Sequence, residues 1–324
     1  MLSEDQSLRP RKTGQPVTLA VGTMNFGKRT PEPEAARIVR RALDRGLTFF
    51  DTANAYNDGN SERILGRALG AERNRCAIAT KVGFGRNAGK PEGLAPERVL
   101  AAIDESLERM GTDYADVYYL HVPDPRTPID ETLSAMKQVL DSGKARAWGV
   151  SNYASWQILE MMLIADRIGL PRPAVSQQMY NTLIRQLDVE YFKFATRFAI
   201  HTTVYNPLAG GLLVGRHRED GTTRGGSRFD KNTLYLGRYW TETFFRATGD
   251  LRAIADSAGM GLLELAYAWL GSRPGVDSIL VGPATAQHLD AAIDACNLHL
   301  SQDTLSRVDA VQKAITGTDA SYAR

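Results

Sequence analysis

Short apolar runs alternate along the chain with longer segments in which apolar residues recur every three or four positions. The longer segments, such as Glu34–Asp44 and Glu97–Arg109, are typical of amphipathic helices that bury one face. The short runs have the length of strands and are rich in β-branched and aromatic residues. The expected strands are Val17–Thr23, Thr48–Asp51, Ala77–Lys81, Asp116–His121, Ala147–Ser151, Ala174–Met179, Thr202–Asn206 and Ser278–Gly282.

Eight strands separated by helices predict repeated βα units. Continuous apolar runs such as Val117–Leu120 indicate strands buried on both faces, as in a parallel sheet. The pattern therefore predicts an α/β fold, a single-domain (β/α)8 TIM barrel over residues 17–324. An open, doubly wound parallel sheet is the alternative. Residues 1–16 are mostly polar and contain two prolines, and we expect them to form an N-terminal tail.

The connection before the last expected strand breaks this rhythm, because about 70 residues separate Asn206 from Ser278. It holds a segment rich in Gly and Arg, 215–227, and an aromatic segment, 235–245, besides two helical stretches. Connections of this length in a compact domain commonly cover a functional site. We therefore expect a long loop or lid between the seventh and eighth strands.

Composition argues against several classes of function. The 324 residues include 39 Lys+Arg against 37 Asp+Glu, a formal net charge of +2, so no broad positive field is available to hold nucleic acid. Two cysteines, Cys76 and Cys296, support neither a disulfide scaffold nor a structural metal site. No apolar run approaches the roughly 20 residues that a membrane span requires. We expect a cytoplasmic protein that binds no metal, nucleic acid or membrane.

Polar residues stand at the carboxyl ends of the central expected strands, where (β/α)8 barrels place their chemistry. They follow one another at intervals of 26–40 residues, about one βα unit each, so their side chains would converge on one mouth of the barrel. Each alone has an ordinary structural explanation, such as a helix cap or a rim charge. Together they favour function, because ionisable groups are rarely buried without partners. The residues are Asp51, Lys81, His121, Ser151 with Asn152, Gln177 and Asn206.

Three of these residues form a coherent proton-transfer system with Tyr56, which lies five positions after Asp51. A phenol titrates near pH 10, and a lysine ammonium about 4 Å away would lower its pKa by up to about 3 units. Asp51 would keep Lys81 charged, and His121 would orient a carbonyl oxygen that Tyr56 protonates. No side chain can supply a hydride, so this chemistry requires a nicotinamide cofactor. A metal site is less favoured, because Lys81 would disfavour a cation.

Two glycine motifs suggest a nucleotide but fail on their context. Gly22–Lys28 reads G-x-x-x-x-G-K, yet Arg29 stands where a P-loop has the Ser or Thr that binds magnesium. Gly83–Ala88 loosely fits a dinucleotide motif, yet Gly89 and Pro91 follow, so no helix can start there to hold a pyrophosphate. Neither a nucleotide triphosphatase nor a Rossmann fold is indicated.

The stretches that carry the polar residues resemble those of the aldo-keto reductases. The matching motifs are Phe50-Asp51-Thr52-Ala53 with Tyr56, Thr80-Lys81, Tyr119-Leu120-His121 and Gly149-Val150-Ser151-Asn152-Tyr153. A closer likeness is to the aflatoxin aldehyde reductase branch, which includes succinic semialdehyde reductases. It is carried by Gly22-Thr23-Met24, Asn206–Leu213, Ser227-Arg228-Phe229, Leu234–Trp240 and the terminal Arg324. The likeness covers essentially everything after the tail.

This resemblance implies roles for residues in catalysis and substrate binding. The implied catalytic residues are Tyr56 as proton donor, Lys81 and Asp51, which lower its pKa, and His121, which positions the substrate carbonyl. The branch likeness places Tyr235, Arg238 and Arg324 around the substrate as well. Guanidinium groups pair bidentately with carboxylates, so these arginines suit a substrate that carries one.

The resemblance also implies NADPH as the cofactor. The residues expected to bind it are Met24, Asp51, Ser151, Asn152, Gln177, Asn206, Pro207, Leu208, Gly210, Leu212, Arg216, Arg228, Gly282, Thr285, Gln287 and His288. Ser151, Asn152 and Gln177 would bind the nicotinamide carboxamide, and 206–216 would wrap the pyrophosphate with backbone N–H groups. His288 stands where many members have an arginine for the 2′-phosphate, so the preference for NADPH over NADH rests on the resemblance.

The expected function is the NADPH-dependent reduction of aldehydes to alcohols, with dialdehydes or carboxylate-bearing semialdehydes as candidate substrates. The expected partner is therefore a small-molecule aldehyde or ketone, and the branch likeness suggests a homodimer. Two alternatives stay open. One is ketone reduction in secondary metabolism, and the other is a regulatory or channel-associated subunit that binds nicotinamide and turns over slowly.

Overall fold

The computed structural model describes residues 8–12, 14–87, 89–217, 225–318, 320 and 322. In this part of the chain, eight parallel strands close into a barrel in which neighbours in the sequence are also neighbours in space. The barrel strands are β1 (Thr18–Gly22), β2 (Phe49–Asp51), β3 (Ala77–Val82), β6 (Ala115–Leu120), β7 (Ala145–Ser151), β8 (Val175–Met179), β9 (His201–Tyr205) and β10 (Ser278–Val281). The predicted (β/α)8 barrel is confirmed, and the open-sheet alternative is wrong because β1 pairs with both β2 and β10.

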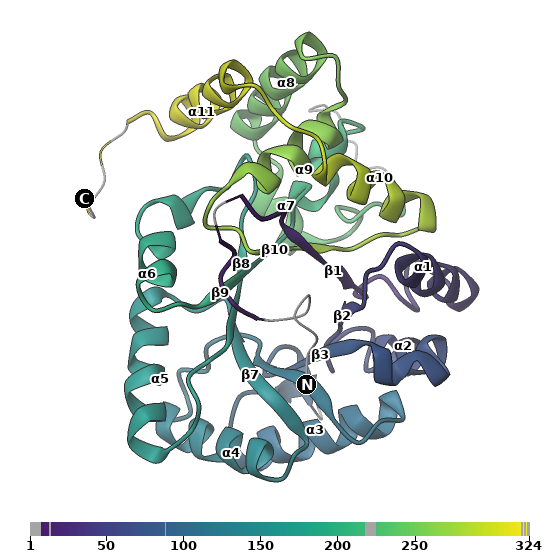
Figure 1. Cartoon of the computed structure of the whole chain (residues 1–324), viewed down its shortest axis with the longest axis vertical. Coiled ribbons are helices and arrows are strands. Elements are labelled where there is room, and N and C mark those ends of the chain that lie inside the picture. Colours follow the sequence, from purple (N-terminus) through teal and green to yellow (C-terminus); the bar gives the residue numbers. More distant parts are fainter. Residues whose placement is uncertain are drawn as a thin grey trace.

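Helices follow the strands and surround the barrel, as Figure 1 shows. They are α1 (Glu32–Asp44), α2 (Asn60–Leu69), α3 (Pro96–Met110), α4 (Ile129–Asp141), α5 (Ser155–Ile168), α6 (Tyr191–Arg197), α7 (Thr233–Tyr239), α8 (Glu242–Ser257), α9 (Leu262–Ser272), α10 (Ala286–Cys296) and α11 (Gln302–Thr316). Short 3₁₀ turns lie at Gly70–Arg75, Gln186–Asp188 and Ala209–Val214. A two-stranded hairpin, β4 (Arg86–Asn87) with β5 (Lys90–Pro91), follows β3 and was not predicted. None of the described helices is long and apolar enough to cross a membrane.

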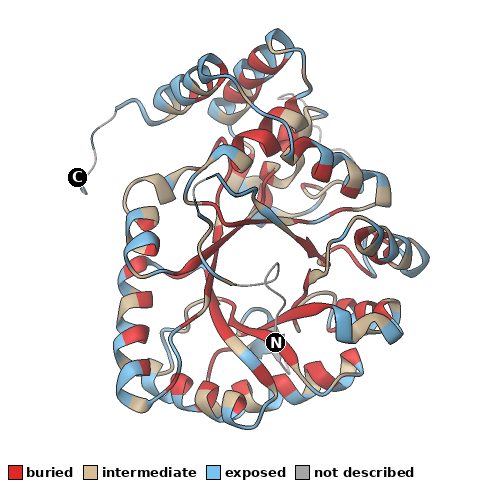
Figure 2. Ribbon diagram, in the orientation of Figure 1, coloured by how far each residue is buried: buried red, intermediate tan, exposed pale blue. Residues whose placement is uncertain are grey.

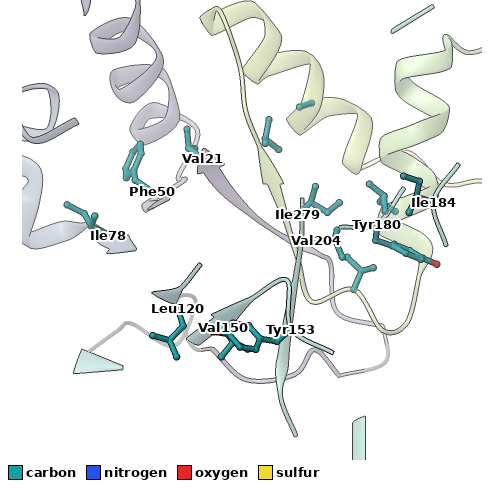
Figure 3. Packing of buried hydrophobic residues seen from close by; sticks show 14 of the residues in the cluster. Val21, Phe50, Ile78, Leu120, Val150, Tyr153, Tyr180, Ile184, Val204 and Ile279 are labelled. Carbon is teal, nitrogen blue, oxygen red and sulfur yellow. The ribbon is translucent and has the colours of Figure 1, made fainter. Parts of the chain in front are cut away.

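Side chains alternate along each barrel strand between the helices outside and the barrel interior. The outward set joins the main hydrophobic core, and Figure 3 shows several of its members, among them Phe50, Ile78, Leu120, Val150 and Ile279. A second, separate cluster fills the interior and consists of Ala79, Val117, Tyr119 and Val175. Figure 2 shows the strands buried while the outer sides of the helices are exposed. The same alternation points the Asp51 and Lys81 side chains into the barrel interior, because the buried residue next to each along its strand points outward.

Gly149 on β7 has no side chain because the barrel interior leaves no space for one. A Cβ atom at this position would lie 2.6 Å from a Val175 methyl carbon and 2.8 Å from the Tyr119 ring. Real Cβ contacts are not this short, and a packed core resists the shift that would be needed. Gly149 therefore allows the large Tyr119 side chain to fill the barrel beneath the site.

Residues 8–12, in the segment expected to be a tail, contact the end of the barrel where the strands begin. Leu8 packs against the interior cluster. Arg11 donates from its backbone N–H to Asp277 Oδ1 at 2.6 Å, and from its guanidinium to the Arg273 carbonyl at 2.6 Å. The Arg9 carbonyl lies 3.0 Å from His201 Nδ1 at the start of β9. These contacts cover the amino-terminal end of the barrel, so the opposite end is the one open to ligands.

The long connection between β9 and β10 contains α7, α8 and α9 and borders the open end. Phe229 and Tyr239 are fully buried, and the Phe229 ring centroid lies 5.0 Å from that of Trp240. This aromatic packing anchors the described part of the connection beside the strand ends. The expected lid is thus an ordered wall of the site over residues 225–240.

Candidate active site

A cavity of about 680 Å³ opens at the carboxyl-terminal end of the barrel strands. Its walls come from the carboxyl-terminal ends and following loops of β1, β2, β3, β6, β7, β9 and β10, from Gln177 on β8 and from the long connection. The predicted site residues that line it are Met24, Asp51, Tyr56, His121, Ser151, Asn152, Gln177, Asn206, Pro207, Leu208, Gly210, Arg216, Arg228, Tyr235, Arg238, Gly282 and His288. A volume of this size is typical of cofactor and ligand sites.

A few predicted residues do not line this cavity. Lys81 lies behind it, in contact with Asp51. Leu212 is buried in the hydrophobic core, so its side chain does not line the cavity as expected for cofactor contact. Thr285 caps α10 by accepting a hydrogen bond from the His288 backbone N–H, and Gln287 is exposed. Arg324 lies outside the described residues.

Asp51 and Lys81 form a buried ion pair that supports the floor of the cavity. Lys81 is 0% exposed, and its ammonium donates to Asp51 Oδ1 and, at 2.7 Å, to the Thr52 carbonyl. The other carboxylate oxygen of Asp51 accepts from Gln177 Nε2 at 2.9 Å. Burial lowers the pKa of Lys81 below its usual 10.5, and the Asp51 carboxylate opposes that effect. Both charges are therefore held by partners on β2, β3 and β8.

Tyr56 lines the cavity beside this pair. The Lys81 ammonium lies 5.2 Å from the centroid of the Tyr56 ring. Burial raises the pKa of the Tyr56 phenol well above its usual 10, and the Asp51 carboxylate raises it further. The predicted lowering of this pKa by Lys81 is therefore wrong, because the cost of burying a phenolate outweighs the attraction of the ammonium. Tyr56 stays protonated at neutral pH and can donate a proton to a bound group.

The His121 ring meets the Tyr56 ring edge to face in the cavity, with ring centroids 5.9 Å apart. Burial and the positive charge of Lys81 hold the pKa of His121 well below its usual 6.5. The imidazole is therefore neutral at neutral pH. Its Nδ1 is buried and has no hydrogen-bond partner in the described part of the chain. Phe84, which sequence reasoning missed, covers the imidazole at a centroid distance of 5.1 Å.

Asn152 follows β7 directly and forms hydrogen bonds with His121, after β6, and Tyr205, at the end of β9. Asn152 adopts φ of 67°, and its amide donates to the His121 carbonyl at 2.9 Å and to Ser151 Oγ at 3.1 Å. Tyr205, a second cavity residue missed by sequence reasoning, donates from its hydroxyl to Asn152 Oδ1 at 2.6 Å. The network fixes Asn152 beside His121, with polar atoms available to an amide ligand.

Positive charge gathers along the rest of the cavity. Arg29 and Arg228 both donate to Asn25 Oδ1, at 3.2 and 3.4 Å, and burial together with the charge of Arg228 lowers the pKa of Arg29 to about 10. Burial and the charge of Arg216 lower the pKa of His288. Cations this close repel one another, so the cavity suits an anion with several charges. Neither Arg29 nor Asn25 was predicted as a site residue. Their positions in the sequence give no indication that they lie next to Arg228 in the fold.

The turn after β9 presents backbone to the cavity. Gly210 has φ of 71° and Gly211 has φ of 108°, conformations that favour glycine. A Cβ at Gly210 would lie 2.7 Å from the Tyr235 ring, so the close approach of this turn to the long connection also requires glycine. Asn206 Nδ2 is buried with no hydrogen-bond partner among the described residues. This unpaired donor and the exposed backbone fit a phosphate-bearing ligand.

Comparisons with known proteins agree on one family. The model of the aldo/keto reductase family matches residues 18–313. A "Probable voltage-gated potassium channel subunit beta" of Arabidopsis thaliana is 34% identical over 288 residues, 87% of this chain and 88% of that protein. The human "Aflatoxin B1 aldehyde reductase member 2" is 34% identical over 296 residues, 86% of this chain and 81% of that protein. The human "Aldo-keto reductase family 7 member A3" is 32% identical over 307 residues, 89% of this chain and 90% of that protein.

Proposed function

Because the chain belongs to the aldo/keto reductase family, whose members reduce carbonyl groups with NAD(P)H, we propose that it reduces aldehydes to alcohols with NADPH. The observation that carries this proposal is the arrangement of Tyr56 and neutral His121 above the buried Asp51–Lys81 pair, at one end of a cavity lined by cations. A protonated phenol and a neutral imidazole at the same place suit a polarised carbonyl oxygen. A cation-lined extension suits a dinucleotide.

The residues present fit the cofactor. Ser151, Asn152 and Gln177 offer hydroxyl and amide groups for the nicotinamide carboxamide. The unpaired donor of Asn206 and the glycine turn after it suit the pyrophosphate, and the cations Arg29 and Arg228 neutralise its charge. When bound, NADPH supplies the hydride for the reduction. The protein supplies orientation and the proton.

The proton comes from Tyr56 in this proposal. A carbonyl oxygen placed between Tyr56 and His121 becomes strongly basic as it gains negative charge, so even a phenol with a raised pKa can protonate it. His121 is neutral and can donate one hydrogen bond without delivering a competing proton. The Lys81 ammonium stabilises the negative charge that the phenol acquires, and Asp51 keeps that ammonium in place.

A carboxylate on the substrate would find partners on the side of the cavity formed by the long connection. The Arg238 and Arg228 guanidinium carbons lie 5.7 and 5.4 Å from the Tyr235 ring centroid. Arg238 also lies close enough to Tyr205 to lower the pKa that burial raises. An arginine that lines the cavity next to the carbonyl site supports a preference for semialdehydes, and Arg324 remains part of this proposal.

The preference for NADPH over NADH is assigned to Arg216 and His288. Both line the cavity, and the charge of Arg216 acts on the His288 imidazole. A 2′-phosphate between them would relieve their repulsion. In a fluorescence titration NADPH should bind at least tenfold more tightly than NADH, and Arg216→Met should reduce that ratio. Equal or tighter binding of NADH by the wild type would overturn the assignment.

The direct test is the initial rate of NADPH oxidation at 340 nm with succinic semialdehyde, compared with neutral aldehydes and ketones. Fast turnover with a low KM for the semialdehyde supports the whole proposal. Turnover confined to neutral aldehydes removes the carboxylate preference and keeps the reductase. Preference for ketones instead favours the alternative of ketone reduction.

Similarity to a channel β subunit favours one second candidate, a nicotinamide-binding regulatory subunit with slow turnover. The arrangement of Tyr56, Lys81 and His121 favours the enzyme over this candidate. NADPH binding without oxidation by any reactive aldehyde would select the subunit. A cytoplasmic location and a homodimeric state belong to the same proposal.

A further inference from the structure

The three residues that follow Tyr56 all have a left-handed backbone. Asn57, Asp58 and Gly59 have φ of 52°, 53° and 77°. Glycine adopts this region freely, Asn and Asp adopt it more often than other side chains, and runs of such residues are uncommon. The segment between Tyr56 and α2 is therefore a strained turn, and such turns persist only where surrounding contacts hold them.

The side chain of Asn57 makes contacts that hold this turn. Its Nδ2 donates to the Phe26 carbonyl at 2.6 Å and to the Met24 carbonyl at 3.3 Å. An amide nitrogen carries two hydrogens, so one Asn side chain can satisfy both acceptors. Asn57 belongs to the β2–α2 loop, residues 52–59, and both acceptors belong to the β1–α1 loop, residues 23–31. The amide therefore joins the loop of the proton donor to a second loop of the cavity wall.

The β1–α1 loop is itself fixed to the rest of the protein. The Phe26 side chain is 0% exposed and belongs to the main hydrophobic core. Thr30 Oγ1 donates to the Ala284 carbonyl at 3.1 Å, and Asn25 Nδ2 donates to the Gly282 carbonyl at 3.2 Å. The loop is thus anchored both in the core and to the loop after β10. Its carbonyl groups are therefore acceptors of fixed position for the Asn57 amide.

The next residue, Asp58, has the same backbone without such contacts. Its φ of 53° matches the 52° of Asn57, but its side chain is exposed. That side chain forms no hydrogen bond or ion pair with any residue in the described ranges. The two neighbours therefore differ in what the side chain binds and not in backbone conformation. This difference provides a matched control for the role of the Asn57 amide.

We propose that Asn57 is a positioning residue, whose amide holds Tyr56 in the cavity by fixing the backbone that immediately follows it. The backbone hydrogen bonds of Tyr56 are local: its N–H donates to the Ala53 carbonyl at 3.0 Å, and its carbonyl accepts from the Ser61 N–H at 3.3 Å. The Asn57 amide supplies a bond to a different loop. A reacting group displaced by about 1 Å can react up to about a hundredfold more slowly. The catalytic part of this inference rests on the proposed function, and the attachment of the loop does not.

Hydrogen–deuterium exchange on the full chain without cofactor tests the attachment of the loop. N57G keeps the left-handed backbone and removes the amide, and N57D keeps the size of the side chain but presents a carboxylate that can only accept. Peptides that cover residues 53–61 should exchange about tenfold faster or more in both variants. D58G makes the same change to glycine one position later and should exchange like the wild type. Circular dichroism and a Tm within about 5 °C of the wild type report that each variant is folded.

Single-turnover reduction of succinic semialdehyde by bound NADPH tests the effect on catalysis. N57G should lower the rate about tenfold or more and leave the Kd for NADPH within about threefold of the wild type, whereas D58G should leave both unchanged. In the Tyr56→Phe background N57G should cause no further loss, because no phenol remains to be misplaced. A general loosening of the barrel would instead lower the rate by the same factor in both backgrounds.

Three results would overturn the proposal. Exchange unchanged by N57G would show that the amide does not hold the loop, and equal acceleration in D58G would assign the effect to the backbone. Faster exchange with an unchanged turnover rate, or an equal loss of rate with and without the Tyr56 hydroxyl, would refute the positioning role. A wild type that reduces no aldehyde would contradict the proposed function, and the exchange data would then decide whether Asn57 holds Tyr56.

Discussion

Replacing Lys81 by methionine keeps most of the length of the side chain and removes its charge. We expect this change to destabilise the fold by about 3–5 kcal/mol, the usual cost of removing one partner of a buried ion pair. In the variant Asp51, only 1% exposed, would retain Gln177 as its side-chain partner at 2.9 Å. The Thr52 carbonyl would also lose the donor that Lys81 provides at 2.7 Å. Urea unfolding followed by circular dichroism measures the loss.

The reciprocal variant, Asp51→Asn, should respond differently to pH. Burial already lowers the pKa of Lys81, and Asp51 is the strongest group opposing that effect, so its removal lowers the pKa further. Between this folded-state pKa and the unfolded value near 10.5, the unfolded chain binds more protons, so stability rises with pH. The loss of unfolding free energy in Asp51→Asn should therefore shrink as the pH rises toward 10.5, and the loss in Lys81→Met should not, because that variant has no lysine to titrate at position 81.

The double variant, Asp51→Asn with Lys81→Met, completes the cycle. It leaves no unpaired buried charge at this site. Its loss of unfolding free energy should therefore be smaller, by roughly 1–3 kcal/mol, than the sum of the losses in the two single variants. Lys144→Met is the matched control, since Lys144 forms a partly exposed ion pair with Asp104, and it should change stability by at most about 1 kcal/mol. A Lys81→Met protein within about 1 kcal/mol of the wild type, or an Asp51→Asn deficit independent of pH, would refute the reasoning.

Four other changes test separate parts of the account. Tyr56→Phe should lower kcat at least a hundredfold and leave the Kd for NADPH within about twofold, measured by steady-state kinetics and fluorescence titration; an unchanged kcat would remove Tyr56 from its role. Arg238→Met should raise the KM for succinic semialdehyde about tenfold or more and leave that for butanal unchanged. Gly149→Ala should cost about 1–3 kcal/mol in urea unfolding, because its Cβ would overlap Val175. The pKa of His121 is lowered in the folded protein, so the unfolded chain binds more protons below about pH 6.5. The stability of the wild type should therefore fall from pH 7 to pH 5, and His121→Asn should lose less stability over that range.

The sequence was sufficient to predict the barrel because its strands are nearly continuous apolar runs. All eight expected strands overlap observed ones, with ends that differ by at most two residues. The convergence of Asp51, Tyr56 and His121 followed from the same pattern, since polar residues at the ends of parallel strands must share one mouth of the barrel. Regular spacing along the chain was therefore enough to predict both the fold and the residues that meet at the centre of the site.

Features that depend on burial or on distant segments were not visible in the sequence. The direction of the Tyr56 pKa shift was predicted wrongly, because the prediction used the attraction of the nearby Lys81 ammonium, whereas burial of the phenol has the larger effect on its pKa. Arg29 and Arg228 lie close together in the cavity although about 200 residues separate them in the sequence, and no local sequence pattern predicts this proximity. Arg11, in a polar segment, covers the far end of the barrel through hydrogen bonds to α9 and Asp277. In each case, the tertiary fold determined the outcome.

The central claim is that this protein transfers hydride from NADPH to a carbonyl group while Tyr56 supplies the proton. A single-turnover experiment tests it most directly: the protein with stoichiometric NADPH is mixed with excess succinic semialdehyde and followed at 340 nm. We predict loss of the bound NADPH absorbance at a rate on the order of 1 s⁻¹ or faster, and at least a hundredfold more slowly in Tyr56→Phe. Bound NADPH that stays reduced for many minutes with this and every other aldehyde tried would contradict the claim.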